Sequence, residues 1–86
     1  MADGVSEEKQ RAYFERTKKG VLRWLAEQGG SATLADMHEY SSSKFLVAHQ
    51  GFSKLMESCV EEALVDYDRA SNTASLTDAG RAFAAA

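Results

Sequence analysis

The chain has 86 residues, of which 44% are hydrophobic and 27% charged, and its formal net charge is −3. This length fits one small domain near the lower limit for a single core without metals or disulfides, and the composition excludes a disordered chain. The apolar runs are too short for a membrane span, and the first residues lack an apolar signal core. We therefore expect a cytoplasmic protein without a membrane partner.

The N-terminal region predicts a disordered tail over residues 1–5 and a helix from Ser6 to about Gln28. Ser6 offers a capping hydroxyl, and the two glutamates after it are favourable near the positive end of the helix dipole. Gly29 and the glycine after it end the helix. We expect a single domain over residues 6–86.

Two stripes run along this first helix. One is apolar, has Lys18 near its edge and should face the core; it comprises Phe14, Val21, Leu22 and Leu25. The other contains Gly20, which costs roughly 1 kcal/mol relative to Ala inside a helix and so suggests either close approach of another backbone or a break in the helix; we favour close approach. This second stripe has no obvious partner within the chain. We therefore expect a homodimer through Tyr13, Thr17, Gly20 and Trp24, the alternative being that the aromatic residues cap the domain's own core.

The next segment predicts a short strand at residues 31–33 and a second helix, capped by Thr33 and with Asp36 at its third position. Serines are unfavourable inside a helix, so we place a turn near the serine run at residues 41–43. Phe45 and its two apolar successors would then return to the core. A second interpretation continues the helix through the serines to Val47, since residues 34, 37, 41 and 45 share one face.

The stretch from residue 52 to residue 68 changes from a helical to an alternating period. A third helix is predicted to start within residues 48–51 and to bury one face, made of Phe52, Leu55, Met56, Cys59, Val60 and Ala63. Alternation over residues 64–68, a turn, and a second short strand at residues 73–76 then predict a β-hairpin.

A short final helix is predicted after Thr77, its cap, with Phe83 on the inward face. The order is therefore helix, short strand, helix, helix, strand, strand, helix, which is an α+β fold that is mainly α. Leu55 and Leu64 are expected in the core. Cys59 is the one cysteine, so it cannot form an internal disulfide, and we expect a structural thiol.

Three local motifs accompany this order: Thr33-Leu34-Ala35-Asp36 opens the second helix, Glu61-Glu62-Ala63-Leu64-Val65 joins the third helix to the hairpin, and Leu76-Thr77-Asp78-Ala79-Gly80-Arg81 follows the hairpin. Together, over about residues 20–83, they resemble the winged helix-turn-helix domains of bacterial and archaeal transcription regulators, with the MarR-like and ArsR-like groups nearest. The resemblance implies a three-helix core, a short two- to three-stranded β wing and a short C-terminal helix. The segment before Phe52 is several residues longer than in the compact motif, and the wing has a single cation.

The resemblance also implies a DNA-binding regulator whose third helix enters the major groove of double-stranded DNA while the wing touches the backbone. The residues in position to do so are Lys44, Gln50, Ser53, Lys54, Arg69 and Asn72. Gln50 suits adenine and Lys54 suits guanine or a phosphate, whereas Glu57 and Glu61 repel phosphates. Because the chain lacks an overall basic footprint, the alternative is a winged-helix protein-interaction module without DNA affinity.

Neither catalysis nor a cofactor is expected. The sequence contains no Gly-rich phosphate loop, no HExxH and no GxSxG. His38, His49 and Cys59 match no common zinc spacing, so we predict no metal site. We interpret the basic cluster of the first helix as a solvated face, although it is the densest in the chain; it consists of Arg16, Lys18, Lys19 and Arg23.

Overall fold

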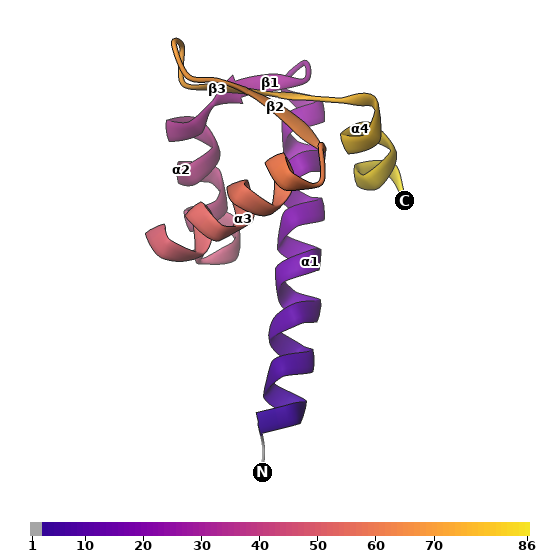
Figure 1. Ribbon diagram of the computed structural model, residues 1–86. Coiled ribbons are helices and arrows are strands. Elements are labelled where there is room, and N and C mark those ends of the chain that lie inside the picture. The colour runs from indigo at the N-terminus through magenta and orange to yellow at the C-terminus, as the bar shows by residue number, and fades with distance from the viewer. Residues whose placement is uncertain (1–2) are drawn as a thin grey trace.

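The computed structural model describes residues 3–86, with side chains from Glu8 onward, and has the predicted order of elements (Figure 1). These are α1 (Asp3–Glu27), β1 (Ser31–Thr33), α2 (Leu34–Phe45), α3 (His49–Glu61), β2 (Val65–Asp68), β3 (Thr73–Leu76) and α4 (Asp78–Ala85). The fold is α+β and mainly helical. None of these helices is both long enough and apolar enough to cross a membrane.

The three strands form one antiparallel sheet in the order β1-β3-β2. The central strand β3 pairs with β1 through Ser31 and Ser75, and with β2 through Val65 and Leu76. In Figure 1 the sheet closes one end of the helical layer, and the N-terminal half of α1 projects away from it. The sheet therefore joins residues 31–33 to a hairpin that lies more than 30 residues later in the chain.

The core lies where α1, α2 and α3 meet the sheet and α4. Its fully buried members include Val21, Leu22 and Leu25 of α1, Met37 of α2, and Leu55 and Cys59 of α3. The prediction that Leu55 and Leu64 are core residues is confirmed, because they are 1% and 5% exposed. Burial raises the pKa of the Cys59 thiol to about 12, which fits a structural role.

Two threonine caps fix where helices begin. The Thr33 hydroxyl accepts a hydrogen bond from the Asp36 N–H at 3.1 Å, and the Thr77 hydroxyl accepts one from the Gly80 N–H at 3.0 Å. Each cap satisfies an N–H group that the first turn of a helix leaves without a partner. Both predicted helix starts are confirmed.

Several boundaries differ from the prediction. α1 begins at Asp3, so residues 3–5 of the expected tail are helical, and Met1 and Ala2 lie outside the described residues. α2 continues through the serines to Phe45, so the turn predicted there is wrong. The buried Ser41 hydroxyl donates to the His38 carbonyl at 3.0 Å, which keeps its hydrogen bond inside the helix.

α2 ends on Leu46, which has a left-handed backbone with φ of 56°. The side chain of Leu46 is 86% exposed, so its predicted return to the core is also wrong. Its neighbours Phe45 and Val47 are partly buried against the core.

Candidate functional site

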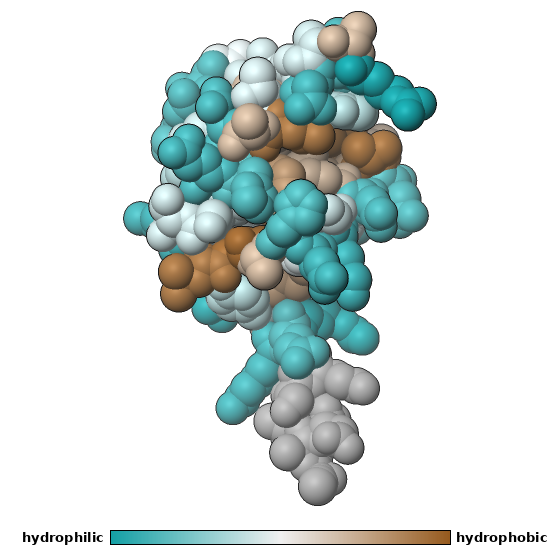
Figure 2. Space-filling view, turned by 90° about the vertical axis from the view of Figure 1, so that its left-hand side faces the viewer, coloured by the Kyte–Doolittle hydropathy of each residue, from teal (hydrophilic) through white to brown (hydrophobic). Residues whose placement is uncertain are grey.

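A groove of about 710 Å³ lies between α2, α3 and the β2–β3 hairpin. We call it the α3–hairpin groove. Figure 2 shows the side of the molecule that carries these elements, where apolar surface is framed by polar side chains. The volume falls within the range of about 300 to 1,000 Å³ that is typical of binding pockets.

The floor of the groove is apolar because each of the three elements contributes at least one apolar or aromatic side chain. Met56 lies at the edge of the buried face of α3, and Val60, one turn later, also lines the groove but is 48% exposed. Val60 was predicted on the buried face, so this position is corrected. Tyr67 is on the same face of the hairpin as buried Val65 but further from the core, and is 39% exposed. Leu34 completes the floor from α2.

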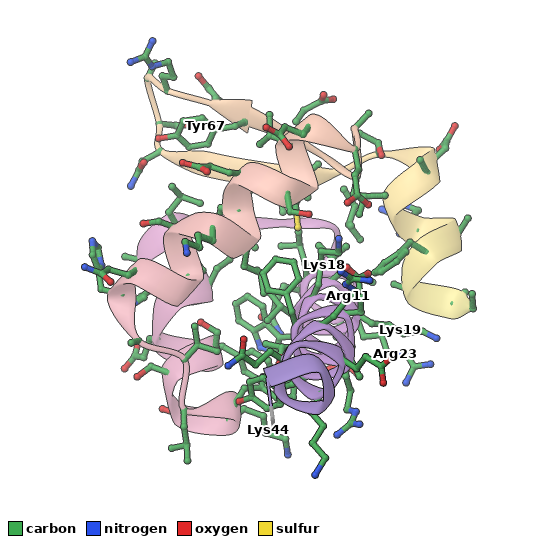
Figure 3. The ribbon with its side chains drawn as sticks, turned by 60° about the horizontal axis from the view of Figure 1, so that its bottom comes forward. Arg11, Lys18, Lys19, Arg23, Lys44 and Tyr67 are labelled. Atoms are coloured by element: carbon green, nitrogen blue, oxygen red, sulfur yellow. The ribbon has the colours of Figure 1, made fainter. Side chains whose placement is uncertain are left out.

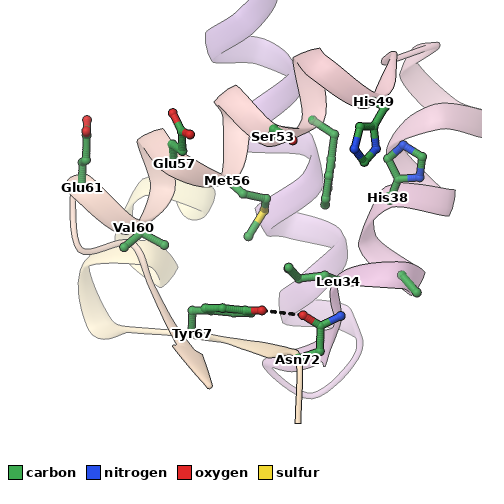
Figure 4. A pocket seen from close by; sticks show the side chains of 12 residues that line it. Leu34, His38, His49, Ser53, Met56, Glu57, Val60, Glu61, Tyr67 and Asn72 are labelled. Atoms are coloured by element: carbon green, nitrogen blue, oxygen red, sulfur yellow. Dashed lines mark hydrogen bonds between the residues drawn. The ribbon is translucent and has the colours of Figure 1, made fainter. Parts of the chain in front are cut away.

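Hydrogen bonds hold the hairpin in place as one wall of the groove. The Tyr67 hydroxyl donates to the Asn72 side-chain oxygen (Figure 4). Asn72 has a φ of 56°, a left-handed conformation that asparagine tolerates in turns. Its carbonyl accepts from the Leu34 N–H at 2.9 Å, so the tip of the hairpin is tied to the start of α2.

Two histidines stand at one end of the groove, as Figure 4 shows. The His38 ring makes edge contacts with Phe52 and with His49, at centroid distances of 5.0 and 5.5 Å. The buried Nε2 atom of His38 has no hydrogen-bond partner in the structure. Among the described residues, no group of three or more His, Cys, Asp or Glu side chains is placed to hold a metal ion.

The surroundings of the groove are acidic. Glu57 and Glu61 line it from α3, at the end opposite the histidines (Figure 4). From Leu34 to Leu76, the span that builds the groove, seven acidic residues face three basic ones. The last turn of α3 contains no basic residue, so the cation that lies at the negative end of the helix dipole comes from another element, α1.

A buried cation joins the C-terminal end of α3 to α1. The Lys18 side chain is 0% exposed, and its Nζ lies 2.9 Å from the Ser58 hydroxyl and 3.0 Å from Glu62 Oε2. Burial by itself lowers the pKa of Lys18, but the hydrogen bond with Glu62 and the charges of Glu15 and Glu62 outweigh it, so the pKa is raised. Hydrogen bonds from Lys18 and Ser58 lower the pKa of Glu62. The end of α3 that carries the acidic rim is therefore fixed in position.

This contact changes the interpretation of the basic cluster on α1. Lys18 is not part of a solvated face, as Figure 3 shows by its place among the packed elements. The Arg23 guanidinium donates to the Ala84 carbonyl at 2.8 Å and so ties α1 to α4. The place of Lys18 near the edge of the apolar stripe was compatible with burial, but its partner Glu62 could not be identified from the local sequence, because it is 44 residues away.

The structure does not bring all the predicted DNA-contacting residues together. Gln50, Ser53 and Lys54 are exposed on the first half of α3, and Arg69 is exposed in the hairpin turn. The Asn72 side chain is bonded to Tyr67, as described above. Lys44 is exposed at the far end of α2, about 15 Å along the helix axis from Leu34, since ten residues rise 1.5 Å each.

The stripe predicted to form a dimer has a partner within the chain. Trp24 stacks on Tyr40 of α2 with ring centroids 4.8 Å apart, and a Cβ atom on Gly20 would collide with the Phe45 ring. Thr17 is buried, and the half-exposed Tyr13 donates to the Phe45 carbonyl. The premise that this stripe lacks an intrachain partner is therefore wrong. These contacts fit the alternative to the dimer, in which the aromatic side chains cap the domain's own core. Association of two chains through α1 stays a prediction.

Comparisons of the chain with protein-family models, with curated proteins and with solved structures found no match. The functional argument therefore depends on the groove and on the charges around it.

Proposed function

We propose that this chain is a winged-helix protein-interaction module, in which the β2–β3 hairpin is the wing and the α3–hairpin groove receives a segment of a partner protein. The order of elements and the antiparallel sheet are compatible with a winged helix. The segment that we expect is apolar and carries positive charges.

The observation that carries this proposal is the apolar floor of the groove. Val60 and Tyr67 are large apolar or aromatic side chains that remain 48% and 39% exposed next to buried Met56. A mostly apolar groove with a few polar groups at its border is the usual form of a binding site. Aromatic and Met side chains in such a groove are the usual receptors for apolar anchors of a partner segment.

Charge favours a cationic protein segment over nucleic acid as the ligand. Glu57 and Glu61 border the floor, and the span from Leu34 to Leu76 has a net charge of −4. Such a surface repels phosphates and attracts Lys or Arg. A DNA-binding surface gains its affinity by neutralising phosphates, and this span offers it only three cations.

A second candidate function is binding of duplex DNA. It is favoured by one specific observation, the exposure of Gln50, Ser53 and Lys54 on the first half of α3, ahead of the two glutamates. Arg69 at the hairpin turn would supply a backbone contact. Each phosphate contact would add about −0.9 to the slope of log affinity against log salt concentration.

Backbone amide shifts of isotope-labelled protein test both candidates. The probes are a synthetic peptide of leucines and lysines and a mixed-sequence duplex, each at low and at moderate salt. We expect the peptide to shift amides around the groove, at Met56, Val60 and Tyr67, and Glu61→Lys to weaken this binding. Glu8→Lys, the same charge change on the projecting half of α1, is the matched control and should leave it unchanged.

A specific set of results would favour DNA binding over protein interaction. If the duplex shifted Gln50, Ser53, Lys54 and Arg69, if Lys54→Glu abolished those shifts, and if the peptide left the groove unperturbed, DNA binding would replace protein interaction as the function.

A further inference from the structure

The two ends of the α3–hairpin groove differ in charge. Glu57 and Glu61 stand at the end near the C-terminus of α3, and His38 and His49 stand at the other, near its N-terminus (Figure 4). The dipole of α3 adds to this difference, because it places about half a negative charge at the C-terminal end and half a positive charge at the N-terminal end. The first turn of α3 has no acidic residue, so no side chain of that turn cancels the positive end of the dipole. At the C-terminal end Lys18 of α1 pairs with Glu62, and the negative charge that faces the groove comes from Glu57 and Glu61.

The apolar surface lies between these ends. Met56 and Leu34 are central, and Val60 and Tyr67 lie toward the acidic end. At the histidine end, Phe52 and the edge of the His38 ring continue the apolar wall. A bound segment therefore meets apolar surface along the groove but meets acidic groups only at one end.

We infer that the groove holds its partner segment in one orientation, with Lys or Arg side chains over Glu57 and Glu61 and the apolar anchors extending from there toward His38 and His49. This inference deepens the proposed function and depends on it. The reversed segment would place its cations beside the positive end of α3 and would leave both glutamates without partners.

The spacing of the two acids defines what the segment must carry. Glu57 and Glu61 are four residues apart on one helix, which is about 6 Å along its axis. A partner helix presents cations at this distance when they are at positions i and i+4, and an extended segment does so at i and i+2, about 6.6 Å apart. Both glutamates are exposed, so their attraction sets orientation and association rate more than affinity, and it weakens as salt screens it.

Paramagnetic broadening of amide signals tests the orientation. The probe is a synthetic peptide with a leucine-rich half and a half that carries two Lys four positions apart, and a nitroxide is attached to one end or the other. A label at the cationic end should broaden the amide signals of Glu57 and Glu61 beyond detection and spare those of His38 and His49. A label at the apolar end should give the reverse pattern.

A charge exchange supplies the control for the electrostatic cause. In the double variant Glu57→Lys with Glu61→Lys, a peptide whose Lys pair is replaced by a Glu pair should bind in the same orientation, and the Lys peptide should lose its orientation. Both substituted positions are exposed, so the fold is retained.

The outcomes separate the two proposals. Equal broadening at both ends of the groove by either label would overturn the single orientation while leaving the groove as a protein-binding site. Broadening of neither end, with no shift of groove amides by any of the peptides, would overturn the proposed function itself.

Discussion

Replacement of Glu62 by Gln tests the structural role of the buried Lys18. Gln keeps the size of the side chain and a hydrogen-bond acceptor, but it removes the charge that lies 3.0 Å from Lys18 Nζ. The nearest remaining carboxylate is that of Glu15, at 3.4 Å. A hydrogen bond to a charged group contributes about 1.5 to 3 kcal/mol, and Glu62 is half exposed, so we expect the free energy of unfolding to fall by about 1 to 2 kcal/mol. For a domain of this size each kcal/mol lowers Tm by about 4 to 8 °C.

The matched variant is Lys18→Met, which removes the buried charge and keeps a long apolar side chain between the Phe14 and Phe83 rings. It leaves Glu62 half exposed and able to be solvated, whereas Glu62→Gln leaves a cation with no exposed surface. Breaking a buried pair is costly when the partner that remains is buried, whereas replacing buried charge with apolar volume is often neutral. Chemical denaturation should therefore show a smaller loss in the free energy of unfolding for Lys18→Met than for Glu62→Gln. A larger loss for Lys18→Met would refute this reasoning.

The pH dependence of the same comparison checks the charges directly. The pKa of Glu62 is lowered from 4.5, so its contribution is complete above pH 4.5 and is lost as the pH falls through the folded value. The pKa of Lys18 is raised from 10.5, so its contribution is complete below pH 10.5 and is lost as the pH rises through the folded value. The stability difference between the parent and Glu62→Gln should be flat between these pH values and shrink outside them. A difference that is unchanged at acid pH would show that charge is not its cause.

Two further predictions concern the core and can be measured by thermal and chemical denaturation. Leu55→Ala should cost about 2 to 5 kcal/mol, because Leu55 is 1% exposed at the centre of the core, and a loss of only a few degrees in Tm would contradict the assignment of α3. Gly80→Ala should destabilise more than Gly20→Ala, because the added Cβ meets the backbone carbonyl of Leu64 in the first case and the movable ring of Phe45 in the second; equal losses would show that the ring cannot move aside.

Features that depend on a few neighbouring residues were predictable from the sequence. Thr33 and Thr77 each bond an N–H three residues later, so a capping residue and its spacing are enough to place the starts of α2 and α4. The change from helical to alternating period likewise placed α3 and β2. Each of these signals involves residues that are close in sequence, so it does not depend on contacts between distant segments.

The features that were missed depend on contacts between distant segments. Propensity predicted a turn at the serines, but Tyr40 and Phe45 pack α2 against α1, and this tertiary contact outweighs a weak local preference. The burial of Lys18 similarly needs Ser58 and Glu62. The α3–hairpin groove is formed by three elements that meet only in the folded chain, so its residues could be named from the sequence but not recognised as one site.

The sheet has a consequence for how the protein is made. β3 is the only strand in the described residues that pairs with both others, and it pairs Ser31 of β1 with Ser75 near the end of the hairpin. During synthesis, a chain that has not reached Thr73 has no strand partner for β1 or β2. The long segment between β1 and β3 must also close, and this costs conformational entropy that the hydrogen bonds between the two strands then offset. β2 ends five residues before β3 begins, so β1 is the strand that waits longest, because Thr33 is made 40 residues before its partner Thr73. The N–H and C=O groups that β1 directs toward β3 therefore have no strand partner until β3 has been made.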